Sequence, residues 1–145
     1  MLPTKEIQEY IELKGIPKDL PKKIFSDYLK YESEDNVVWH LTNLYYDILL
    51  YGESLGIKWY VDLRTLDTSP AKEKHLFKIP ILRLEGLIKN GITKCISECL
   101  NNLVFQCHYA ALHFGFSLPK AFEIVHKVRL GITPQEVGRI ECEGL

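Results

Sequence analysis

The sequence predicts an all-α fold, a compact bundle of about five or six helices in one domain that spans residues 1–145. Three observations predict it. Apolar residues recur at spacings of three and four along most of the chain, which is the period of an amphipathic helix. Glycine or proline separates these periodic stretches, as is usual where helices end and begin. A chain of 145 residues that is 46% hydrophobic and 26% charged can bury a core of its own.

The first two helices are expected before residue 35. Residues 4–14 carry an apolar stripe at helical spacing, and Gly15 ends this helix. Residues 16–21 contain two prolines and form a turn, because proline fixes its own φ and disfavours helix in the residue before it. A second helix begins near Pro21, which suits a first turn, and continues to about Tyr31.

Residues 36–55 form the third and most apolar helix. Large side chains fall on more than one side of it, and many are aromatic, which places this helix at the centre of the bundle or at a subunit interface. Gly56 ends it. Residues 57–78 mix strand-forming and turn-forming residues and are expected to be a connection with room for one short helix.

Three further segments complete the expected fold. Residues 80–89 form a helix that Asn90 and Gly91 end, and residues 93–114 form the long helix around which the chain is organised. A last helix begins at Ser117 and ends before Gly131. Residues 132–145 show little periodicity and are expected to fold back over the surface.

One internal similarity links two of these helices. Residues 41–57 align without gaps on residues 100–116, and both segments are apolar, carry an early asparagine and end at glycine. The similarity indicates two equivalent helices of a pseudo-symmetric bundle, or a chance likeness between two buried helices that draw on the same few residue types.

Composition excludes several classes of function. A net charge of −1 argues against general nucleic-acid binding, which requires clustered Lys and Arg. No apolar run reaches the roughly 18 to 20 residues of a bilayer span, so no membrane is expected as a partner. The N-terminus carries charges where a signal peptide needs an apolar core, which favours the cytoplasm and reduced cysteines. Residues 72–94 are modestly basic and form a solvated surface or a phosphate contact.

Polar side chains interrupt the apolar face of the organising helix. Glu98, Asn101 and Asn102 lie near its start. A buried polar group without a partner costs about 1 to 3 kcal/mol, so these groups need neighbouring side chains, a ligand or a metal. The same helix also carries three cysteines and two histidines: Cys95, Cys99, Cys107, His108 and His113. These residues could form a zinc site, but their spacing matches no common zinc module, which favours buried structural thiols.

Residues 80–130 carry a family resemblance. The run ILRLEGLIKNGITKCISECLNNLVF resembles a helix, a short glycine turn and a second helix with Glu-x-x-Asp, and Glu98 to Asn101 falls at that motif. The run HYAALHFGFSLPKAFEIVHKVRL resembles an Ala/Leu helix, a glycine turn and an Ala-Phe-x-x-Val-His helix. Both patterns are similar to the C-terminal half of the MazG-like, all-α nucleoside triphosphate pyrophosphohydrolases.

The resemblance implies a helical bundle that usually dimerises and cleaves a nucleoside triphosphate to monophosphate and pyrophosphate with Mg²⁺. In such chemistry, carboxylates on neighbouring helices hold the Mg²⁺ ions that activate water. The implied metal ligands are Glu85, Glu98 and Asp47. The implied substrate contacts are Lys94, Asn101, Asn102 and Arg129.

The sequence departs from this pattern where the chemistry resides. Asn101 replaces the aspartate of Glu-x-x-Asp, and Arg129 replaces an asparagine near the end of the pattern. The upstream Glu-x-x-Glu is absent, since Ile79 and Leu82 are apolar. Asp47 and Glu53 could supply carboxylates from another helix, but the favoured interpretation is that both point to solvent or to a partner subunit.

Two hypotheses follow from the sequence. The first is a MazG-like protein with a degenerate site, nucleotide-binding, with weak or lost Mg²⁺-dependent hydrolysis. The second is a non-catalytic, homo-oligomeric or partner-binding module that acts through the surface of the aromatic-rich helix of residues 36–55.

Overall fold

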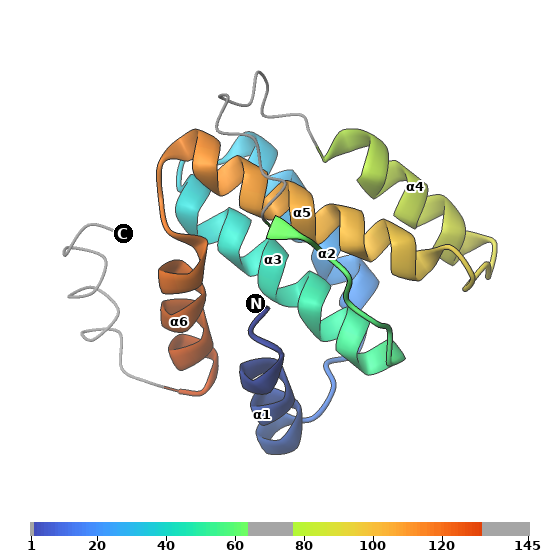
Figure 1. Cartoon of the computed structure of the whole chain (residues 1–145), viewed down its shortest axis with the longest axis horizontal. Coiled ribbons are helices and arrows are strands. Elements are labelled where there is room, and N and C mark those ends of the chain that lie inside the picture. Colours follow the sequence, from blue (N-terminus) through green and yellow to red (C-terminus); the bar gives the residue numbers. More distant parts are fainter. Residues whose placement is uncertain (1, 64–76, 132–145) are drawn as a thin grey trace.

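The computed structural model describes residues 2–63 and 77–131, and these residues form six helices (Figure 1). The all-α prediction is confirmed. The helices are α1 (Thr4–Lys14), α2 (Leu20–Ser33), α3 (Val37–Leu55), α4 (Lys78–Lys89), α5 (Ile96–Phe114) and α6 (Leu118–Arg129). Each overlaps a predicted range. No helix in the described ranges is long and apolar enough to cross a membrane.

Two predictions fall partly or wholly outside the described residues. A short helix was expected within residues 57–78. Residues 57–63 contain no α-helix, and residues 64–76 lie outside the described part of the chain. The fold-back expected of residues 132–145 also lies outside the described part of the chain.

The central element is α3, which packs against α1, α2, α5 and α6. Ten of its 19 residues are buried, and they lie on all sides of the helix. Tyr45 and Tyr46 are among them, whereas Trp39 and Tyr51 are partly buried, so α3 takes the central placement that was one of the two predicted for it. The composition of α3 explains this placement, because a helix that is apolar all round must be surrounded by other elements.

α5 is the structural counterpart of α3. Both helices have 19 residues, and both end at a glycine with positive φ, Gly56 at +68° and Gly115 at +74°. The aligned positions share their burial: Leu41 and Leu100 are both fully buried, as are Leu44 and Leu103. The predicted equivalence of the two segments therefore holds at the level of helix length, ending and buried face.

α4 lies at the edge of the molecule (Figure 1). It packs chiefly against α5, through Ile81 and Leu84, and the Cys99 thiol of α5 donates a hydrogen bond to the carbonyl of Pro80 at 3.3 Å. Phe77, just before α4, is buried edge-on against Tyr31 of α2. One side of α4 thus holds the helix in place, and the opposite side faces outward.

Candidate functional site

Three ionisable groups with shifted pKa values, Asp27, Asp47 and Arg129, form a cluster between α2, α3 and α6. Asp47 of α3 is fully buried, and Arg129 at the end of α6 donates to both of its carboxylate oxygens, at 2.7 and 3.2 Å. The same guanidinium donates to the side-chain oxygen of Asn43 at 2.8 Å. It also lies 4.3 Å from the centre of the Tyr46 ring, a cation–π distance.

Asp27 of α2 completes this cluster. Burial, followed by the hydrogen bond and charge of Asp47, raises the pKa of Asp27 from 3.8 to about 8. Burial alone would also raise the pKa of Asp47, but its hydrogen bonds with Asp27 and Arg129 lower that pKa below 3.8. The two carboxyl groups therefore share one proton at neutral pH, held on Asp27, while Asp47 stays ionised against Arg129.

One oxygen of this carboxyl pair has no partner. Asp27 Oδ2 is buried and accepts or donates no hydrogen bond among the described residues. An unsatisfied buried oxygen is costly, and ionisation of Asp27 would add a second negative charge beside Asp47. The proton on Asp27 consequently stabilises the packing of α2 against α3 and α6.

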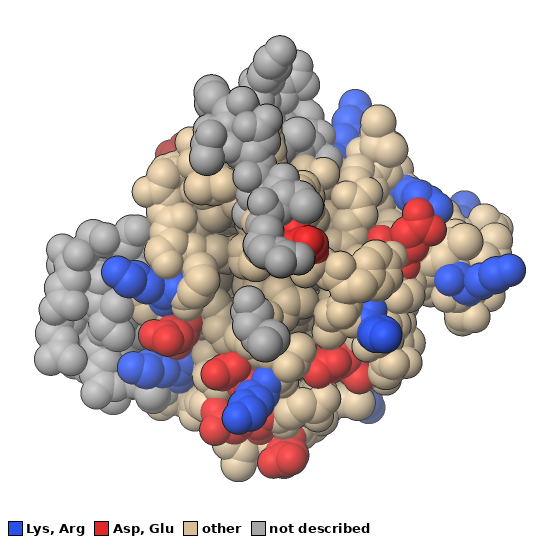
Figure 2. All heavy atoms as spheres, in the orientation of Figure 1, with Lys and Arg blue, Asp and Glu red and all other residues tan. Residues whose placement is uncertain are grey.

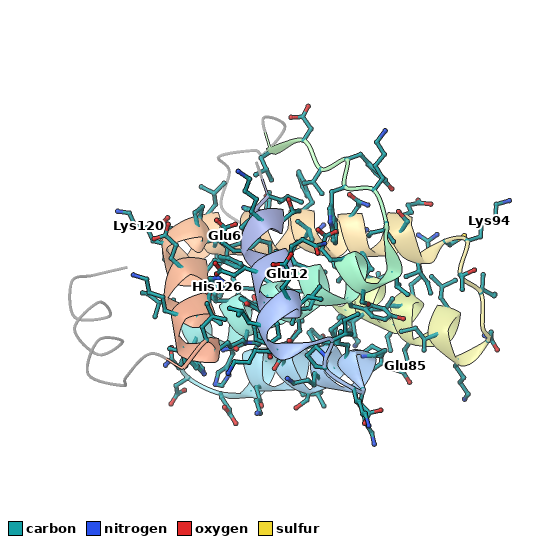
Figure 3. The ribbon with its side chains drawn as sticks, turned by 90° about the horizontal axis from the view of Figure 1, so that it is seen from below. Glu6, Glu12, Glu85, Lys94, Lys120 and His126 are labelled. Carbon is teal, nitrogen blue, oxygen red and sulfur yellow. The ribbon has the colours of Figure 1, made fainter. Side chains whose placement is uncertain are left out.

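A second hydrogen-bonded chain joins α1 to the same cluster. His126 Nε2 lies 2.7 Å from a carboxylate oxygen of Glu9, and His126 Nδ1 lies 2.7 Å from the Tyr46 hydroxyl. Because the carboxylate is an acceptor, Nε2 carries a hydrogen, and in the neutral ring the Tyr46 hydroxyl then donates to Nδ1. Figure 3 shows His126 on α6 facing α1. The cluster therefore connects four helices through side chains that are paired with one another.

Two of the site predictions are corrected here. Asp47 was expected to point to solvent or to a partner subunit, but it is buried because Arg129 neutralises it inside the bundle. Arg129 was expected to face phosphates, but Asp47 and Asn43 occupy the guanidinium. This pair is a connection between α3 and α6.

Asn101 has a local structural function. Its side-chain oxygen accepts from the backbone N–H of Tyr60 at 2.8 Å, and its amide donates to the carbonyls of Lys58 and Ser97 at 3.1 and 2.8 Å. An asparagine amide offers two donors and one oxygen, so both donors and one acceptor position are used. Asn101 therefore holds the segment after α3 against α5.

The remaining predicted residues of α5 line an open groove. Its volume is about 300 Å³, and three predicted residues, Glu98, Asn101 and Asn102, lie along it. Asp62 and the aromatic rings of Tyr60 and Phe105 complete the lining. Glu98 is mostly exposed and lies 4.0 Å from Arg83 of α4. Glu98 and Asp62 are the two carboxylates among these lining residues.

Glu85 and Lys94 do not join either place. Both are exposed, and Figure 3 shows Lys94 at the far tip of the α4–α5 turn and Glu85 pointing away from the body. The seven predicted residues are thus divided among a buried cluster, a groove and the surface. Within the described ranges, no group of three or more His, Cys, Asp or Glu side chains is placed to hold a metal ion. The described residues do not fit a two-magnesium centre.

Sequence reasoning missed Asp27, Asn43 and the Tyr46–His126–Glu9 chain. The one available signal was Asp27 itself, a carboxylate in the middle of an amphipathic helix and next to Tyr28. Its partners are supplied by α3 and α6, which no local pattern in α2 reveals.

Comparison with known proteins gives no match: no family model, curated protein or solved structure is significantly similar to this chain.

Proposed function

We propose that this protein works by binding another protein chain through the outward side of α4. The observation that carries the proposal is the exposure of two large apolar side chains on that side, Ile79 at 78% and Leu82 at 56%. With Gly86 they lie at helical positions i, i+3 and i+7, opposite the side that packs on α5. Ile79, Leu82 and Gly86 are called the α4 ridge below.

The ridge supports a binding function because its apolar groups are contiguous. Single exposed apolar side chains are ordinary on protein surfaces, whereas neighbouring ones with polar residues around them mark interaction sites. Lys78, Arg83 and Lys89 are the exposed basic residues beside this stripe. The α4 surface is preferred to the α3 surface because Tyr45 and Tyr46 of α3 are buried in the core.

The proposal retains the MazG-like architecture as the ancestry of the bundle. It includes a second copy of this chain among the possible partners, as the resemblance implies. Light scattering measures the oligomeric state directly, before and after substitution of the ridge.

Photocrosslinking tests the ridge itself. A photoreactive amino acid at position 82 should yield a discrete crosslinked species in cells that express the full chain. The matched control carries the same amino acid at position 13, because Leu13 of α1 is 66% exposed and lies away from α4. Ile79→Ser should remove the species formed from position 82. Equal crosslinking from positions 13 and 82, or none from either, would contradict the proposal.

A second candidate function is Mg²⁺-dependent cleavage of a nucleoside triphosphate at the α5 groove. The observation that favours it is the presence of Glu98, Asn102 and Asp62 along one open groove beside two aromatic rings. Carboxylates could hold Mg²⁺ there, and a base could stack on an aromatic ring. Glu98 and Asp62 are the carboxylates among the described lining residues, and two carboxylates predict weak hydrolysis.

This second candidate is tested by pyrophosphate release from a panel of nucleoside triphosphates with and without Mg²⁺. Glu98→Ala should abolish release, and Glu85→Ala, which alters an exposed carboxylate outside the groove, should not. Absence of release from every nucleotide, together with no Mg²⁺-dependent shift in melting temperature, would reject it.

A further inference from the structure

The α4 ridge lies in the basic part of the chain. Residues 77–95 contain four basic side chains, Lys78, Arg83, Lys89 and Lys94, and one acidic side chain, Glu85, which gives a formal charge of +3. The whole chain carries −1, so the rest of it is acidic. Figure 2 shows several Lys and Arg side chains at the side of the molecule where α4 lies. Among the described residues, Arg83 lies 4.0 Å from Glu98, and because both side chains are largely exposed this contact is weak.

We propose that the ridge binds an acidic amphipathic helix of a different protein. This inference rests on the proposed function of α4 and specifies its partner. An apolar stripe with flanking positive charge is complementary to a helix that has an apolar stripe and flanking Asp or Glu. The ridge extends over two helical turns, about 10 Å, which matches the apolar stripe of one partner helix laid alongside.

Charge argues against a second copy of this chain at the same surface. Two ridges placed face to face would bring two segments of charge +3 together. Like charges across an interface disfavour association, because each basic group loses water without gaining an acidic neighbour. A homo-oligomer would therefore use another surface, and the ridge remains available to an acidic partner.

Gly86 gives the ridge a position of close approach. It lies on the outward side of α4, and a Cβ built there would meet no atom within 4 Å. A partner backbone can come closer to a glycine than to any other residue, as at small-residue crossings between helices. A large side chain at position 86 should therefore block the partner while leaving the packing of α4 on α5 unchanged.

The test uses the full chain and synthetic peptides of about 20 residues, long enough to form a helix. One peptide has leucine at i, i+3, i+4 and i+7 with glutamate on its other positions. A second has lysine in place of each glutamate. Binding is measured by fluorescence anisotropy at low and high salt, and vesicles of phosphatidylcholine with phosphatidylserine serve as an anionic surface of another kind.

The glutamate peptide should bind, and the lysine peptide should not. Ile79→Ser with Leu82→Ser should weaken binding about tenfold or more, as should Gly86→Leu. Arg83→Glu with Lys89→Glu should reverse the preference between the two peptides. Leu13→Ser and Lys120→Glu are the matched controls on α1 and α6 and should bind as the unmodified chain does. Circular dichroism confirms that each variant is folded.

Three results would overturn the inference, and they separate it from the proposed function. Equal binding of both peptides, or binding unaffected by the ridge variants, removes the acidic partner. The inference would also be contradicted if the chain formed a dimer and the double substitution Ile79→Ser with Leu82→Ser dissociated it. That result would leave the proposed binding function of α4 intact. If the ridge bound vesicles and neither peptide, both the acidic partner and the protein-binding function of α4 would be contradicted.

Discussion

At the scale of single residues, the shared proton of Asp27 and Asp47 makes the stability of this bundle depend on pH. The folded state holds a proton on Asp27 up to a pKa of about 8, whereas the unfolded chain releases it near 3.8. Between these values the folded state binds more protons than the unfolded state. Stability from this group is therefore complete below about pH 3.8, falls as pH rises between these two values, and is lost once pH has passed about 8.

Asp27→Asn tests this dependence. The asparagine amide can donate to Asp47 as the protonated carboxyl does, and it has no proton to lose. Melting temperatures measured from pH 5 to pH 9 should fall for the unmodified chain and stay flatter for Asp27→Asn, which should be the more stable protein at pH 9. Asp27→Ala removes the donor and should be less stable than Asp27→Asn throughout. Parallel curves for the unmodified chain and Asp27→Asn would contradict the assignment.

The Asp47–Arg129 pair predicts a different pattern of stability. Removing one member of a buried ion pair leaves the other charge without compensation, at a cost of about 3 to 5 kcal/mol. Asp47→Ala and Arg129→Ala should each lower the free energy of unfolding by about that amount in urea titrations. The double variant should lose less than the sum, because no charge is then left unpaired. Additive losses would show that the two side chains act independently.

At the scale of elements, the two glycines of the helix interiors predict opposite effects. A Cβ at Gly52 of α3 would lie 2.2 Å from the ring of Trp59, whereas one at Gly86 of α4 would meet nothing. Gly86→Ala should therefore stabilise the protein by about 0.5 to 1 kcal/mol, through the better helix propensity of alanine. Gly52→Ala should destabilise it, because the Trp59 ring must move. Thermal unfolding of both variants measures the contrast, and similar shifts would refute it.

The connection after α3 depends on one side chain of α5. Asn101→Ala removes three hydrogen bonds and leaves the Tyr60 amide without its acceptor. Amide hydrogen exchange at Tyr60 should become faster, while exchange in the middle of α5 stays slow. Asn102→Ala, on an exposed neighbour, should leave Tyr60 unchanged. Unaltered exchange at Tyr60 in Asn101→Ala would mean that other contacts hold this segment.

The same scale shows what the sequence could predict. All six helices were predicted close to their observed bounds, because glycine, proline and apolar spacing act locally. The equivalence of α3 and α5 was also visible, since both keep their buried leucines and final glycine in register. The surroundings of Asp47 were not predictable in this way. Arg129 is distant in sequence, and only the crossing of α6 over α3 brings the two together.

At the scale of the whole molecule, the site residues predicted from the family resemblance lie in three separate places. Glu98, Asn101 and Asn102 share a groove because they occupy one side of one helix. Glu85 and Lys94 lie at the surface, and Asp47 and Arg129 lie inside the bundle. Helical spacing could predict the first group. The other placements depend on how whole helices pack, which the linear pattern does not encode.

The attachment of α4 along a single side has an evolutionary consequence. Residues that secure the helix, such as Ile81 and Leu84, are separate from those at the ridge. Positions 79, 82 and 86 can therefore change from one relative to the next without loss of the native state. Substitutions there can change which partner is recognised, while purifying selection keeps the residues that hold the bundle together.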